Sequence, residues 1–156
     1  KMIAFAAFWL IQDFAQVLMM GLSMVPDIFL LSIILSALLS NNRRDRQILL
    51  IWIAFLGGLI WDLRWTNLTG LTAAVNAAAV SLVCFVWQMT PAQGRTVALF
   101  TVICMAVQIF SGVVHYIFWI IPSQAAVRQI TVQSLLSVPV IIIISLLYWK
   151  ASDKHV

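Results

Sequence analysis

Residues 96–119 read TVALFTVICMAVQIFSGVVHYIFW, and this run decides the class of fold. It holds no Lys, Arg, Asp or Glu over a length that exceeds the roughly 20 residues of a membrane-spanning helix. A transmembrane β-strand is about ten residues long and alternates in polarity, so the unbroken apolar run predicts a helix. Over the whole chain, 63% of the residues are hydrophobic and 9% are charged. Soluble domains carry roughly a quarter charged residues, so the composition predicts an integral membrane protein and excludes a soluble enzyme or DNA-binding domain.

Five further apolar runs are separated by polar, Gly- or Pro-containing turns. With residues 96–119 they predict a single domain over 1–156, a compact all-α bundle of six transmembrane helices. The second and third runs are short for a 30 Å hydrocarbon core, which leaves a re-entrant hairpin as an alternative. Two spanning helices are favoured, because the hairpin would bring the arginines of 43–46 to membrane depth. The predicted helices cover about 2–22, 26–40, 48–64, 70–87, 96–119 and 127–149.

The basic residues predict the orientation of this bundle. Cytoplasmic loops of membrane proteins are enriched in Lys and Arg. One set of predicted ends and loops holds only Arg64 and Arg128. The other set holds the remaining seven, so both termini are expected in the cytoplasm: Lys1, Arg43, Arg44, Arg46, Arg95, Lys150 and Lys154. The pI of about 9.6 therefore reflects membrane topology, and no nucleic-acid partner is predicted.

Polar side chains within the apolar runs are the candidate functional residues. Asp13 lies near the middle of the first predicted helix, where an aspartate costs about 2.5–3.5 kcal/mol, so it is expected to face the interior, a cavity or a partner. Cys104, Gln108, Ser111 and His115 share one helical face. Such side chains either form an outward-facing polar cavity or partner face, or make interhelical hydrogen bonds worth about 0.6 kcal/mol each. The candidate set is Asp13, Gln16, Asn76, Gln108, His115, Gln129 and Gln133.

Motifs of catalysis and metal binding do not occur in the sequence. It contains no His-x-x-Glu pair, no Cys pair at metal spacing and no Gly-rich phosphate loop. We therefore expect a protein that is not an enzyme, with no cofactor and no metal. The row Ala73, Ala77 and Ser81 and the pair Gly57-Gly58 predict close helix packing inside the bundle.

A sequence pattern between Pro26 and about Ala78 resembles that of a known family. Pro26-Asp27 opens a leucine-rich helix, and a short basic loop follows. The next helix ends in Gly58-Leu59-Ile60-Trp61-Asp62-Leu63, and Gly70-Leu71 opens the one after it, eight residues beyond the aspartate. This third of the chain is similar to the rod shape-determining protein family MreD. The family-pattern positions are Pro26, Asp27, Gly58, Asp62, Gly70 and Leu71.

The resemblance implies a non-catalytic scaffold subunit in the bacterial cytoplasmic (inner) membrane. Such subunits bind the single-span protein MreC and regulate peptidoglycan synthesis and cell shape. Their machinery links MreB filaments to a glycosyltransferase–transpeptidase pair. It also implies a fold like the six-helix substrate-binding subunits of energy-coupling-factor transporters. Within it, Pro26 is expected as a first helical residue, Asp27 at the helix N-terminus, and Asp62 as a cap for the fourth helix.

The alternative interpretation is a solute-binding membrane subunit of an energy-coupling-factor vitamin transporter. It shares the six-helix plan and the outward polar cavity. Those subunits usually carry an Ala-xxx-Ala docking motif in their first helix. The alanines of the first run here, Ala4, Ala6, Ala7 and Ala15, are never four residues apart, which favours the MreD-like interpretation.

Overall fold

The computed structural model describes residues 2–18, 25–39, 44–65, 69–118 and 124–152. The regular structure in this part of the chain is entirely helical. It consists of α1 (Met2–Leu18), α2 (Ile28–Leu38), α3 (Arg44–Trp65), α4 (Leu71–Met89), the short 3₁₀ helix η1 (Ala92–Gly94), α5 (Val97–Phe118) and α6 (Gln124–Ser152).

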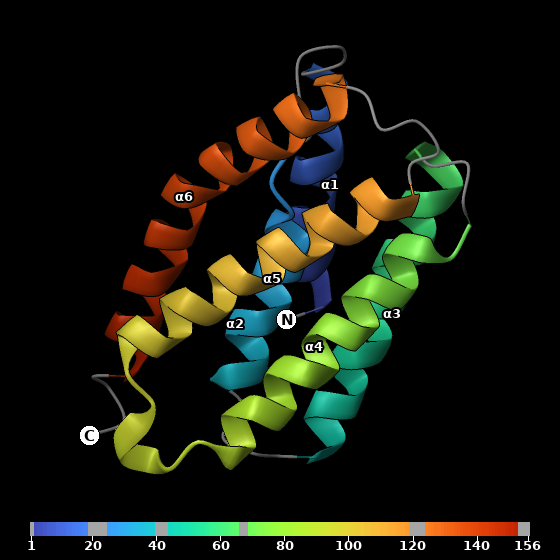
Figure 1. The fold of residues 1–156 in the computed structure, drawn as a ribbon. Helices are drawn as coiled ribbons and strands as arrows, with labels where there is room; N and C mark the ends of the chain where they lie inside the picture. The colour runs from blue at the N-terminus through green and yellow to red at the C-terminus, as the bar shows by residue number, and fades with distance from the viewer. Residues whose placement is uncertain (1, 19–24, 40–43, 66–68, 119–123, 153–156) are drawn as a thin grey trace.

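The helices run alternately up and down between two ends of the bundle (Figure 1). At the upper end in that view, α1, α3 and α5 finish and α2, α4 and α6 begin. The most extensive contacts join α3 to α4 and α5 to α6, so these form two helical hairpins. The helix α2 contacts α1, α3, α4 and α6, which places it between the hairpins.

The shortest α-helix, α2, forms the core of the bundle. Its sequence IFLLSIILSAL is apolar on every side, which is typical of a helix surrounded by protein. Leu30, Leu31, Ile33 and Ile34 have no exposed surface. With 11 residues, α2 is about 17 Å long, well short of a 30 Å hydrocarbon core.

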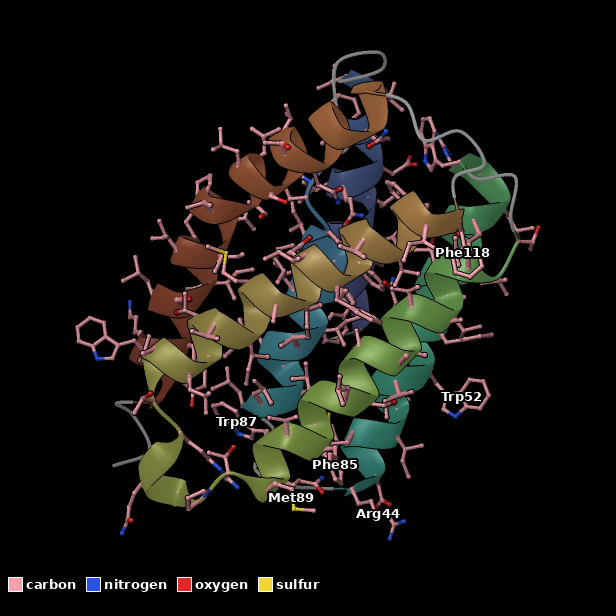
Figure 2. The ribbon with its side chains drawn as sticks, viewed as in Figure 1. Arg44, Trp52, Phe85, Trp87, Met89 and Phe118 are labelled. Atoms are coloured by element: carbon pink, nitrogen blue, oxygen red, sulfur yellow. The ribbon has the colours of Figure 1, made fainter. Side chains whose placement is uncertain are left out.

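Among the described residues, four helices are long and apolar enough to cross a membrane: α3, α4, α5 and the part of α6 from Thr131 to Ala151. Their outward side chains are apolar as well. Trp52 and Phe85 project away from α3 and α4 (Figure 2), and more than half of each side chain is exposed. Exposed surface of this kind suits lipid rather than water. The fold is therefore that of an all-α protein with four candidate membrane spans, together with the shorter apolar helices α1 and α2.

Two of the predicted helix starts differ from those in the structure. The helix predicted over 48–64 begins at Arg44, because the exposed residues Arg44, Asp45 and Arg46 form its first turn. The helix predicted to start at Pro26 begins at Ile28, since Asp27 is the N-cap and accepts a bond from Leu30 N. Pro26 is therefore not the first helical residue, and that prediction is wrong. Residues 19–22 and Trp119, which were predicted to be helical, lie outside the described residues.

Candidate functional site

Polar side chains gather at the upper end, around the start of α2. We call them the upper polar layer: Gln12, Gln16, Asp27, Thr72, Asn76, Gln108, Ser111 and His115. From α1, Gln12 Oε1 accepts a hydrogen bond from Phe29 N at 2.8 Å, and Gln16 Oε1 accepts one from Val25 N at 3.3 Å. Asp27 Oδ1 accepts one from Leu30 N at 3.1 Å. These bonds satisfy backbone N–H groups that have no partner within the helix itself.

Gln12 is a member of this layer that the predicted candidate set did not include. Its amide is 6% exposed and bonds directly to the first turn of α2. The signal in the sequence was its spacing of four residues from Gln16, which places both amides on one helical face.

Asp27 is the point at which α1, α2 and α5 meet. Gln108 Nε2 donates to the backbone oxygen of Asp27 at 3.4 Å. The Asp27 carboxyl also interacts with the Gln12 amide. This carboxyl is buried, with 8% of the residue exposed. It forms no ion pair with any cationic side chain that the structure describes.

A histidine joins α5 to α4. His115 Nδ1 lies 2.8 Å from the backbone oxygen of Ser111, and Nε2 lies 3.0 Å from Thr72 Oγ1. Because a carbonyl oxygen can only accept, Nδ1 carries the proton of this bond. The predicted face of Cys104, Gln108, Ser111 and His115 is confirmed, since all four are buried or half-buried.

Two fully buried amides in the layer have oxygens without a hydrogen-bond partner. They are Asn76 Oδ1 and Gln108 Oε1, in residues that are 2% and 4% exposed. A buried polar atom left unpaired costs about 1–3 kcal/mol. Gln133 Oε1 on α6 is a third such atom, but no hydrogen bond among the described residues joins it to the layer. The side chain of Gln129 lies outside the described part of α6.

Asp13 is buried and paired inside the chain. Its Oδ1 lies 2.9 Å from Arg64 Nε and accepts a bond from Trp65 Nε1 at 2.8 Å. The Arg64 guanidinium also stands over the Trp65 ring, 5.5 Å from its centroid. Arg64 and Trp65 are the last residues of α3, so Asp13 lies at the upper end of the bundle. The helix α1 therefore packs with this residue against the end of α3.

Most of the family-pattern positions lie where the end of α3 meets the start of α4. Asp62 Oδ2 accepts hydrogen bonds from Gly70 N at 2.9 Å and Ala73 N at 3.2 Å, and Asp62 has no exposed surface. Gly70 has φ = +97°, a conformation that favours glycine. A Cβ at Gly58 would lie 2.7 Å from the backbone of Ala73. The prediction that Asp62 caps the fourth helix is confirmed, and Leu71 is the first residue of that helix.

The chemistry available in the upper polar layer is that of hydrogen bonding. Its groups are amides, hydroxyls, one imidazole and one carboxyl, held by four helices. Among the described residues, no group of three or more His, Cys, Asp or Glu could hold a metal ion. A scan against protein-family models, a search of curated proteins and a search of solved structures each found no match to the chain.

Proposed function

We propose that the protein is a non-catalytic scaffold subunit of the MreD type. In this proposal it crosses the bacterial cytoplasmic membrane six times, with both termini in the cytoplasm. It binds a single-span MreC-like protein and regulates peptidoglycan synthesis and cell shape in the elongation machinery. The wall-synthesising glycosyltransferase–transpeptidase pair and MreB filaments are its indirect partners.

The observation that carries the proposal is the contact between the end of α3 and the start of α4, which involves Gly58, Asp62 and Gly70. Each of these resemblance positions has a specific structural task there. Gly58 allows the backbone of α4 to approach, Asp62 caps α4, and Gly70 adopts a positive φ. A pattern whose members meet at one helix–helix contact is a stronger basis for a resemblance than scattered apolar identities.

The hydrogen bonds and the ion pair made by the buried polar side chains also support a scaffold function. Asp13, Asp62, Gln12 and Gln16 are all bonded to groups of this same chain. Their carboxylates and amides position helices, as expected of a subunit that acts by holding partners. Because Asp13 is paired with Arg64 of the same chain, it is not the residue we expect to contact a partner first.

A second candidate is the solute-binding subunit of an energy-coupling-factor vitamin transporter. The observation that favours it is the pair of unpartnered buried amide oxygens on Asn76 and Gln108. Buried acceptors of this kind are suited to a ligand with N–H or O–H groups.

Native purification distinguishes the two candidates. The full chain would be tagged, produced in a rod-shaped bacterium and purified in mild detergent, and the bound proteins and small molecules identified by mass spectrometry. The control is an unrelated membrane protein with the same tag. The proposal expects a single-span MreC-like protein in the sample and absent from the control. Recovery of transporter ATPase subunits with a vitamin-sized ligand would replace the scaffold with the second candidate.

A further inference from the structure

We propose that the upper polar layer binds a primary ammonium group, held by the Asp27 carboxylate and the amide oxygens of Asn76 and Gln108. This inference goes beyond the scaffold function and does not depend on it. It starts from the two unpartnered amide oxygens, which belong to residues with at most 4% of their surface exposed.

The packing of α4 against α5 places both amides on the same side of the bond between Thr72 and His115, about 6 Å along α4 and about 11 Å along α5 from it. The bond between Thr72 Oγ1 and His115 Nε2 aligns the two helices. Asn76 lies four residues after Thr72, on the same face of α4. Gln108 lies seven residues before His115, on the same face of α5. Because the helices run in opposite directions, both steps lead from the Thr72–His115 bond towards the lower end.

Gln108 also connects this part of the bundle to the backbone of Asp27. Its Nε2 donates to the Asp27 backbone oxygen, which leaves Oε1 as the end of the amide without a partner. The Oδ1 atom of Asn76 has no hydrogen-bond partner. This part of the bundle therefore contains two amide oxygens without a hydrogen-bond partner, on Asn76 and Gln108, and Gln108 is bonded to Asp27, whose carboxyl is buried.

The buried carboxyl of Asp27 favours a ligand that carries a positive charge and hydrogen-bond donors. A buried carboxylate is stable when it is paired, and Asp27 has no ion pair within the described residues. The other ionisable groups at this end are already engaged, since Asp13 pairs with Arg64 and Asp62 caps α4. His115 bonds to the neutral oxygens of Thr72 and Ser111. A primary ammonium carries one positive charge and three N–H donors, which match one carboxylate and two amide oxygens.

Thermal unfolding of the purified full chain in mild detergent tests this proposal with methylammonium chloride as the probe. Tetramethylammonium chloride and sodium chloride, at the same ionic strength, are the comparison salts. We expect a saturable rise in unfolding temperature with methylammonium alone, because only this ion combines a charge with N–H donors.

Two variants locate the site. In Asn76→Leu the apparent affinity for methylammonium is expected to fall about tenfold or more, because a charged hydrogen bond is lost. Its unfolding temperature without the probe should be unchanged or higher, since an unpaired buried amide is removed. Asp27→Asn keeps an N-capping side chain and should abolish the response. Ser81→Ala is the matched control, since Ser81 is exposed on the same helix as Asn76 and bonds only to Ala77 O.

Three results would overturn the proposal. An equal shift with sodium would indicate a site for hard cations, and an equal shift with tetramethylammonium would indicate a general effect of charge. No shift with methylammonium at any concentration would exclude an ammonium site. If Asp27→Asn fails to fold, Asn76→Leu still decides the question, because a full methylammonium response in that variant contradicts the assignment.

Discussion

At the scale of single residues, carboxylates organise the upper end of the molecule. Asp27, Asp62 and Asp13 each accept hydrogen bonds from this chain, at the start of α2, at the start of α4 and from the end of α3. Helix N-termini carry free N–H groups and a partial positive charge, so an aspartate stabilises each of the first two sites. The third bond ties α1 to α3, in a region where these helices meet mainly through side chains.

Replacing the cap of α4 should destabilise the fold. In Asp62→Ala the buried donors of Gly70 and Ala73 lose their acceptor, and we expect a loss of about 2–3 kcal/mol in the free energy of unfolding. Asp62→Asn retains an acceptor oxygen and should lose less. Reversible unfolding in detergent, followed by tryptophan fluorescence, measures both. Equal losses in the two variants would show that the charge matters rather than the hydrogen bonds.

The ion pair between Asp13 and Arg64 should contribute modestly. The Arg64 side chain is 53% exposed, so its attraction to Asp13 is weakened by surrounding solvent. A double-mutant cycle with Asp13→Asn and Arg64→Gln is expected to give a coupling free energy of at most about 1 kcal/mol. The cycle is measured by unfolding of the two single variants and the double variant. A coupling several times larger would mean that the pair is shielded from water by detergent or lipid.

At the scale of elements, two adjacent glycines of α3 determine how four helices meet. The backbone oxygen of Gly57 accepts a hydrogen bond from Trp9 Nε1 of α1 at 3.1 Å. A side chain at Gly57 would collide with the ring of Phe29 on α2, and one at Gly58 with the backbone of α4. The predicted close approach of helices at Gly57-Gly58 is confirmed for Gly58 and Ala73. The remainder of the predicted small-residue row turns outward, since Ala77 is half-buried and Ser81 is exposed.

A methyl group at this contact should force α3 and α4 apart. We expect Gly58→Ala to lower the free energy of unfolding by about 1–3 kcal/mol, because the new Cβ would lie 2.7 Å from the backbone of Ala73. Adding Ala73→Gly should not restore stability, since the colliding atoms belong to the main chain. Ala78→Leu, on the exposed face of α4, is the control and should have little effect. Rescue by Ala73→Gly would place the collision at the Ala73 side chain instead.

At the scale of the whole molecule, the core extends from α2 into both hairpins. Buried side chains of α3, α4, α5 and α6 pack around α2, and the stacked rings of Phe100 and Tyr148 join α5 to α6. The two cysteines lie in this core, Cys84 with 5% and Cys104 with 0% of its surface exposed. Their accessibility therefore reports on opening of the bundle as a unit.

Labelling with a maleimide should follow global unfolding. In the folded protein Cys84 and Cys104 are expected to react very slowly, and both should react once a denaturing detergent opens the core. Intact-mass spectrometry counts the labels over time. Gln93→Cys, at the exposed position of η1, is the control that should react at once. Fast labelling of Cys104 without denaturation would contradict the described core.

Much of the fold follows from local sequence. Long apolar runs interrupted by turn residues predict helices, and all six predicted helices occur among the described residues. The cap at Asp27 was also predictable, because its carboxylate bonds to a backbone N–H three residues ahead. The cap at Asp62 was predicted from its place just before the connection to the fourth helix. Boundaries were less accurate at Arg44 and Ile28, since charged and capping residues can either extend a helix or precede it.

The neighbours of each polar residue were decided by tertiary structure alone. Sequence placed Asp13 at mid-helix, but its surroundings depend on how α1 packs against the end of α3. It likewise marked Asn76 and Gln108 as polar without showing that their oxygens lack partners. Hydrophobic periodicity reports which residues avoid water, whereas hydrogen bonds between helices depend on their relative tilt and register. Composition and local pattern therefore determined a bundle of apolar helices, and packing around α2 decided which polar groups meet and which buried oxygens have no partner.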